Sequence, residues 1–220
     1  KDLISTDAPY IFHGEEPAER PFIGRHILEG SKPGAAAAAC WFAHRVVPLN
    51  QSGYGMLIGQ GLQGAQALCY RLSKELAPAL AQRGIRLHVL TEPPDSNIFC
   101  FVVNRAGNAS LARMNQFNQA IYDELKFNPD SVIQRHNFML SSTDLTFPQY
   151  GLPDSTGKHS VDEHLTALGI APEQFAEIGA VKVLRCTVMN PWLTLSRAGH
   201  PDYSVAFTAT LQQTIERILA

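Results

Sequence analysis

The sequence predicts an α+β fold, in which an antiparallel sheet is covered by helices on one face and is preceded by long helices. Two stretches of strand character, residues 85–89 and 97–104, follow each other across a turn rich in proline, as antiparallel neighbours do. On either side of them, apolar residues recur at helical spacing. The chain has 220 residues, of which 45% are hydrophobic and 17% charged, so it can bury a substantial core.

The composition argues against several classes of protein. A net charge of -2 leaves no basic excess for phosphates, so we expect no nucleic-acid partner. No apolar run reaches the roughly 18 residues of a membrane-spanning helix, so we expect no membrane partner. The four cysteines stand far apart and the histidines show no ligand spacing, so we expect no metal site. The cysteines lie in apolar stretches, which is typical of reduced, buried thiols in a cytoplasmic protein.

Residues 1–34 are predicted to form an irregular segment, because four prolines and four glycines interrupt them. A loop of this length usually has a function. Tyr10 and His13 could act there as acid and base beside two glutamates. Composition alone favours the alternative, in which Tyr10 and Phe12 pack while the charged groups face water.

Two helices are predicted next. Residues 33–47 are small or apolar on all sides, which indicates a buried helix that packs closely on its neighbours. Residues 54–82 carry leucines at helical spacing, and Gly84 is placed to cap the end of this second helix.

The strands and the remaining helices follow in order. Residues 85–89 alternate between apolar and polar, as in a half-buried strand, whereas 97–104 are continuously apolar and indicate a central strand. The further elements are a helix capped by Asn108 or Ser110 and running to Phe127, a strand over 137–145, a short helix opened by a capping box of Ser160 and Glu163, a strand over 181–189 and a helix over 203–219.

A candidate anion site lies at residues 30–34, just before the first predicted helix. Gly30 and the hydroxyl of Ser31, together with the positive end of the helix, suit a phosphate group. The alternative is that Ser31 only caps the helix. The order of residues is not that of a Walker loop.

Arg185 is a second candidate, because it stands between Leu184 and Cys186 in an apolar strand. If its side of the strand is internal, the guanidinium needs an anion, such as the carboxylate of a ligand. Alternatively, the strand lies at the edge of the sheet and Arg185 is exposed. The residues alone favour neither.

Five motifs follow one another along the chain: residues 27–35, Trp41-Phe42, Gly53-Tyr54-Gly55, residues 97–101 and residues 183–187. Together they resemble the group II pyridoxal-phosphate-dependent amino acid decarboxylases, a family that includes aromatic amino acid, glutamate and tyrosine decarboxylases. The last two motifs resemble the first and last strands of the family's C-terminal domain. The resemblance covers most of the chain and is poorest over residues 129–180.

This resemblance implies a fold-type-I enzyme of the α/β class, a homodimer with its active site at the subunit interface. Such an enzyme uses pyridoxal 5'-phosphate to remove the α-carboxylate of an amino acid as carbon dioxide, which leaves an amine. Residues 1–84 would then be the last part of the large cofactor-binding domain, and residues 85–220 would form the small C-terminal α+β domain.

The resemblance also implies roles for individual residues. Gly30 and Ser31 would bind the cofactor phosphate of the neighbouring subunit, Ser31 through its hydroxyl. Tyr10 would lie on a mobile catalytic loop and return a proton to the substrate carbon. Arg185 would bind the substrate carboxylate, as an arginine of the small domain does in some members.

One part of the family pattern is missing. The lysine that binds the cofactor covalently follows a histidine in this family, and none of the six lysines has that context. Lys32 takes the place of a family arginine. The chain also does not begin with Met. We therefore expect a C-terminal fragment that is inactive by itself.

Two alternatives remain from the sequence. The chain could be a catalytically inactive module for dimerisation or interaction, in which case the protein would not absorb visible light as a cofactor complex does. It could also belong to a carbon–carbon lyase of the sphingosine phosphate lyase type, which would require a basic phosphate pocket and membrane attachment.

Overall fold

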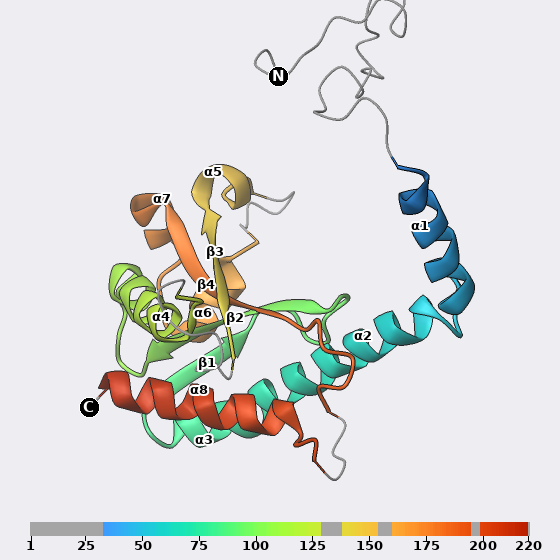
Figure 1. Cartoon of the computed structure of the whole chain (residues 1–220). Helices are drawn as coiled ribbons and strands as arrows, with labels where there is room; N and C mark the ends of the chain where they lie inside the picture. The colour runs from blue at the N-terminus through green and yellow to red at the C-terminus, as the bar shows by residue number, and fades with distance from the viewer. Residues whose placement is uncertain (1–32, 129–137, 154–159, 195–198, 220) are drawn as a thin grey trace, which may run out of the picture. The chain divides into compact units, whose positions relative to one another are not determined.

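The computed structural model describes residues 33–128, 138–153, 160–194 and 199–219. The chain divides into two compact units, Lys1–Tyr54 and Gly55–Ala220. The sheet and most of the helices belong to the second unit (Figure 1).

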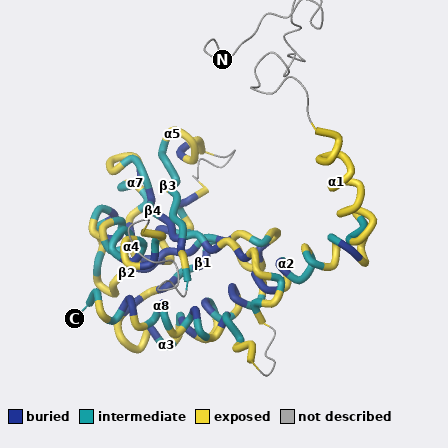
Figure 2. The backbone as a smooth tube through the Cα atoms, in the orientation of Figure 1, coloured by how far each residue is buried: buried dark blue, intermediate teal, exposed yellow. Residues whose placement is uncertain are grey.

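In the first unit, helix α1 covers Gly34–Val46, close to its predicted bounds. None of its residues is buried against the described part of the chain, and Trp41 and Phe42 are 63% and 64% exposed (Figure 2). The prediction of a buried helix is therefore wrong for this chain. Alanine forms helix by its own propensity, but burial requires a second surface.

The second predicted helix is one continuous run of three segments. Helix α2 covers Tyr54–Tyr70, a π-helical segment η2 covers Arg71–Leu76, and α3 covers Ala77–Ala81. Pro78 has no N–H to donate to the carbonyl of residue 74, which accounts for irregular bonding here. Gly84 follows with a positive φ of 72°, as its predicted role in ending the helix requires.

Four strands form one antiparallel sheet in the order β1-β2-β4-β3. They are β1 (Ile85–Val89), β2 (Ile98–Arg105), β3 (Ser141–Thr146) and β4 (Ala180–Thr187). The antiparallel sheet and the central place of the 97–104 strand are confirmed. Because β4 lies between β2 and β3, the last strand in sequence is also central.

Helices cover both faces of this sheet, not one. Side chains alternate along β2 and β4, so that Phe101 and Leu184 belong to one apolar cluster and Val102 and Val183 to another. The first cluster includes η2, α3 and α8 (Tyr203–Leu219); the second includes α6 (Asp162–Leu168) and α7 (Gln174–Ile178). Continuously apolar strands have two faces to bury, which is why one covered face is not enough.

Helix α4 (Leu111–Leu125) fills a gap inside the sheet. Strands β2 and β4 pair only from Ile98–Thr187 to Phe101–Leu184 and then diverge. The buried Asn118 accepts a hydrogen bond from the Val103 N–H at 2.9 Å and donates to the Val103 carbonyl at 2.8 Å. The α4 side chains thus replace the missing strand partner. Ser110, one of the two residues predicted to cap α4, does so: its hydroxyl accepts a hydrogen bond from the Arg113 N–H.

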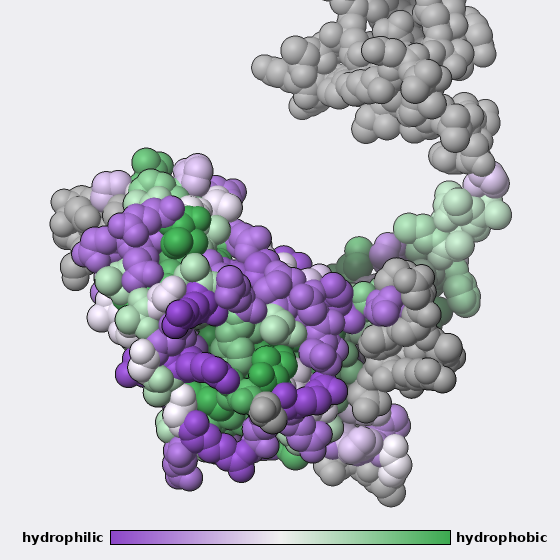
Figure 3. All heavy atoms as spheres, turned by 90° about the vertical axis from the view of Figure 1, so that its left-hand side faces the viewer, coloured by the Kyte–Doolittle hydropathy of each residue, from purple (hydrophilic) through white to green (hydrophobic). Residues whose placement is uncertain are grey.

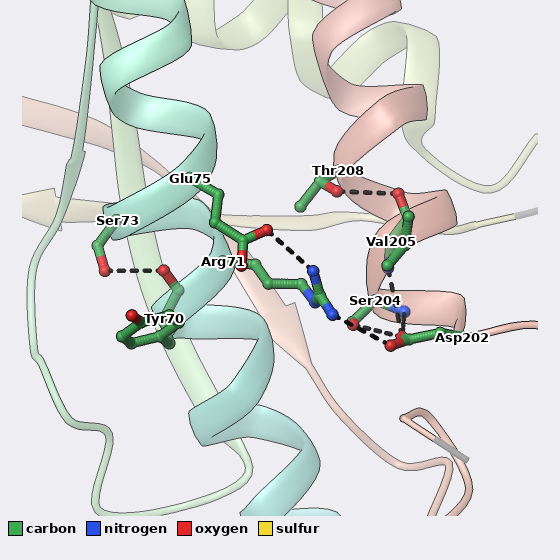
Figure 4. A network of polar contacts seen from close by, with 8 residues as sticks. All are labelled: Tyr70, Arg71, Ser73, Glu75, Asp202, Ser204, Val205 and Thr208. Carbon is green, nitrogen blue, oxygen red and sulfur yellow. Dashed lines mark hydrogen bonds and ion pairs between the residues drawn. The ribbon is translucent and has the colours of Figure 1, made fainter. Parts of the chain in front are cut away.

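The N-terminus of α8 is held by a charged network (Figure 4). Asp202 Oδ1 accepts a hydrogen bond from the Ser204 N–H at 2.9 Å, and its Oδ2 lies 3.2 Å from Arg71 Nη2. Arg71 also pairs with Glu75 at 2.9 Å. This network joins η2 to α8, two elements that are distant in the sequence.

Some local predictions fail. Helix α6 begins after Val161 with no side-chain cap, so the capping box of Ser160 and Glu163 does not form. Helices α5 (Phe147–Tyr150) and α7 were not predicted, since both are too short for a clear helical period.

The core of the second unit begins before the sheet. Leu72, Leu76 and Leu80 share one cluster with Ile85 and other sheet residues. The domain boundary after residue 84 stays a prediction. The face of the unit seen in Figure 3 is largely hydrophilic, with apolar areas near its centre. Among the described residues, no helix is long and apolar enough to cross a membrane.

Candidate functional site

Arg185 lies on the central strand β4, and its side chain is half-buried. The alternative of an exposed arginine on an edge strand is therefore wrong. Alternation along β4 places Arg185 on the same side as Val181 and Val183, which belong to the second apolar cluster. The guanidinium of Arg185 is therefore partly shielded from water by the central strand and its apolar neighbours.

Two neutral residues flank Arg185 across the sheet. The strand register pairs it with Ser141 on β3 and with Cys100 on β2. The Arg185 Nε donates to the Ser141 hydroxyl at 3.0 Å, and that hydroxyl donates to the Arg185 carbonyl at 2.9 Å. Burial raises the pKa of the Cys100 thiol, although the positive charge of Arg185 acts against this rise. Neither neighbour neutralises the guanidinium.

Within the described residues, no carboxylate forms an ion pair with Arg185, and its terminal nitrogens have no hydrogen-bond partner. Lys182 on the same strand, by contrast, pairs with Asp144 at 2.9 Å. Arg185 is therefore a half-buried cation. Its two terminal nitrogens can donate hydrogen bonds to a planar anion.

A hollow of about 670 Å³ adjoins this end of β4. Its volume is in the range of sites for small molecules. Arg185 and Ser141 contribute to its wall, which is otherwise mainly apolar and aromatic. Apolar residues in the wall include Phe127, Phe138, Met139 and Met189. This combination suits a ligand with an apolar body and one carboxylate.

A larger hollow of about 870 Å³ lies where β2 meets α4, and Arg105 and Arg113 contribute to its wall. Both arginines are exposed, and the Arg105 guanidinium lies 5.9 Å from the centre of the Phe117 ring. Water already solvates these two charges, so an ion pair with them would stabilise a bound anion less than an ion pair with Arg185 would.

The other residues predicted for the site, Tyr10, Gly30 and Ser31, lie outside the described residues. Among the described residues, no group of three or more possible ligands could hold a metal ion. The three described lysines are each paired with a carboxylate, and none is placed to bind a cofactor covalently. These pairs are Lys74–Glu92, Lys126–Asp123 and Lys182–Asp144. The described residues by themselves therefore do not build a pyridoxal phosphate site.

The cysteines offer no reactive thiol in the core. Burial and the Glu92 carboxylate raise the pKa of Cys69 to about 11, and burial raises the pKa of Cys186. The prediction of buried thiols is wrong for Cys40, which is exposed on α1. No described cysteine is paired in a disulfide.

Sequence reasoning missed two contacts between distant residues. No sequence pattern indicated that Ser141 contacts Arg185, because this contact depends on the register of the two strands. His164 on α6 is half-buried, and its Nδ1 lies 2.9 Å from His88 Nε2. The alternation of 85–89 placed His88 on one face of its strand, but nothing in the sequence indicated its partner.

A comparison with known families identifies the class of protein. Residues 64–217 match the model of the tyrosine decarboxylase C-terminal domain. The chain therefore belongs to this family, and the resemblance to the group II decarboxylases is confirmed. The match runs through residues 129–180, where the motifs alone were poorest.

Curated relatives agree with the family match. The chain is 36% identical to an L-tyrosine decarboxylase of Enterococcus faecalis over 219 residues, which cover 99% of this chain and 33% of the relative. It is 33% identical to an L-tyrosine decarboxylase of Levilactobacillus brevis, over 100% of this chain and 33% of the relative. The chain thus spans about a third of the length of these relatives.

Proposed function

We propose that this chain is the C-terminal part of a decarboxylase that removes the α-carboxylate of L-tyrosine as carbon dioxide and releases tyramine. The observation that carries this proposal is the 36% identity to an L-tyrosine decarboxylase along 99% of the chain. Both of these relatives, and a third from Enterococcus faecium, are named L-tyrosine decarboxylases, which favours this reaction over the carbon–carbon lyase alternative.

Arg185 is the residue of this chain proposed to bind the substrate carboxylate. Its half-burial, its lack of an ion pair among the described residues and the adjoining apolar hollow support this role. A carboxylate on the terminal nitrogens would form charge-assisted hydrogen bonds in a site partly shielded from water.

Pyridoxal 5'-phosphate is the proposed cofactor, in a fold-type-I enzyme. When bound, it supplies an electron sink for the bond that breaks at the substrate carbon. Ser31, with the backbone of Gly30, is proposed to bind its phosphate, and Tyr10 is proposed to return a proton to the substrate carbon. Because the described lysines are all ion-paired, we expect the covalent attachment to come from outside these residues.

The intact enzyme is proposed to be a cytoplasmic homodimer with its active site at the subunit interface. The exposed side chains of Trp41, Phe42 and Val46 on helix α1 support a subunit interface, because another protein surface could bury them. Exposed apolar surface of this kind is typical of contacts with further protein.

The test is amine release by the intact protein, purified with pyridoxal phosphate, from a panel of amino acids. We expect tyramine from L-tyrosine. Arg185→Gln should raise the KM for tyrosine about tenfold, as the loss of a charge-assisted hydrogen bond does, and leave the visible absorption of the cofactor unchanged.

Three outcomes would contradict parts of this proposal. Amine release from another amino acid but not from tyrosine would refute the substrate. An unchanged KM in Arg185→Gln would refute the role of Arg185. A protein that binds no pyridoxal phosphate would support the alternative of an inactive module.

A further inference from the structure

We propose that Ser141 is a positioning residue for Arg185, whose side chain it holds at Nε so that both terminal nitrogens present themselves to the substrate carboxylate. This inference rests on the proposed carboxylate-binding role of Arg185. It adds a second residue, on a different strand, to the recognition of the substrate.

The Ser141 hydroxyl makes two hydrogen bonds to the same residue. Its proton is donated to the Arg185 carbonyl at 2.9 Å, and its oxygen accepts from Arg185 Nε at 3.0 Å. A hydroxyl has one proton, so the bond to the carbonyl directs a lone pair of the oxygen toward Nε. The register of β3 against β4 places the two residues opposite each other and maintains this arrangement.

Holding the side chain at Nε determines how an anion can approach. A carboxylate can bind an arginine side-on, through Nε and one terminal nitrogen, or end-on, through both terminal nitrogens. Because Nε is already occupied, the end-on approach remains. A held arginine also loses less side-chain freedom when the ligand binds, which improves affinity.

The chemistry of a hydroxyl matters at this position. Serine is neutral and accepts a hydrogen bond without cancelling the charge of the guanidinium. A carboxylate in its place would also accept from Nε but would neutralise Arg185 and compete with the substrate. Cys100, the neighbour on the other side, is also uncharged, since burial raises the pKa of its thiol.

The experiment uses the intact enzyme loaded with pyridoxal phosphate and two competitive inhibitors. The first, 3-(4-hydroxyphenyl)propionate, has the carboxylate but no amine; the second, tyramine, has the amine but no carboxylate. Inhibition constants are measured for Ser141→Ala, Ser141→Thr, Ser141→Asp and Arg185→Gln. Ser142→Ala is the matched control, because Ser142 is the next residue of β3 and points to the opposite face.

We expect Ser141→Ala to weaken the carboxylate inhibitor about tenfold and to leave tyramine inhibition unchanged. Ser141→Thr keeps the hydroxyl and should restore the affinity for the carboxylate inhibitor. Ser141→Asp should weaken it further than Ser141→Ala does, and Ser142→Ala should not change it.

The outcomes separate this inference from the proposed function. If Arg185→Gln does not weaken the carboxylate inhibitor, the role of Arg185 fails, and the inference fails with it. If Arg185→Gln weakens it but Ser141→Ala does not, the positioning role alone is overturned. If Ser141→Ala weakens both inhibitors equally, its effect is a general disturbance of the sheet, which also overturns the inference.

Discussion

At the scale of residues, the described part of the chain depends on a few polar side chains that lie among apolar ones. Asn118 is fully buried and satisfies both backbone groups of Val103, while Asn104 donates to the carbonyl of Leu168 at 2.9 Å. Buried polar groups are costly when they are unpaired, so each of these side chains is irreplaceable by an apolar one of similar size.

Asn118→Ala should destabilise the protein strongly, because it leaves the N–H and the carbonyl of Val103 buried without partners. Unpaired buried groups of this kind cost about 3 kcal/mol together. The free energy of unfolding in urea, followed by circular dichroism, measures the effect. Gln116→Ala on the same helix is the control, since Gln116 is exposed and its loss should cost less than about 0.5 kcal/mol. Equal effects of the two substitutions would refute the role of Asn118.

At the scale of elements, α6 is held on β1 by a pair of histidines. Their rings are 5.2 Å apart between centres, and the His88 Nε2 to His164 Nδ1 distance is 2.9 Å. This hydrogen bond requires one of the two nitrogens to be an unprotonated acceptor. Burial lowers the pKa of both rings; His164 lowers that of His88 further, and Glu163 acts against the fall at His164.

The attachment of α6 should therefore weaken in acid. Both pKa values lie below their usual value of about 6.5, so the unfolded or detached state binds more protons as the pH falls. Stability is present above about pH 6.5 and decreases as the pH falls below it. Hydrogen exchange of the α6 amides in the intact protein, corrected for intrinsic rates, should show less protection at pH 5.5 than at pH 7.5.

The double variant His88→Gln, His164→Asn tests the cause. The amide nitrogen or oxygen of each replacement lies near the ring nitrogen that it replaces, and neither amide titrates. Protection of α6 in this variant should not depend on pH. A pH dependence that persists would show that groups other than this histidine pair cause it.

At the scale of the whole molecule, the length of the chain and the exposure of helix α1 both bear on what surrounds it. It spans about a third of the length of its curated relatives, and helix α1 leaves its apolar side chains uncovered. We expect the exposed Trp41 and Phe42 of this alanine-rich helix to contact protein outside the described residues.

The double substitution Trp41→Glu, Phe42→Glu should therefore have opposite effects in two contexts. In the 220-residue chain it removes exposed apolar surface and should reduce self-association in size-exclusion chromatography. In the intact protein it places charges in a contact and should lower the melting temperature. If the melting temperature of the intact protein is unchanged, α1 is not covered there.

The sequence alone was enough to predict most helices and strands, because their apolar periods are local. The strand 85–89, the helix 203–219 and the long helix that ends before Gly84 match the structure closely. The motifs were also enough to indicate the decarboxylase family. Short helices such as α7 were missed, since five residues show no reliable period.

Tertiary structure decided what depends on contacts between distant residues. The order of the strands, the place of α4 between β2 and β4 and the second covered face follow from how the elements pack. Ser141 and Arg185 are 44 residues apart, and His88 and His164 are 76 apart. No local pattern records such pairs, because the strand register and the packing of α6 bring them together only when the chain has folded.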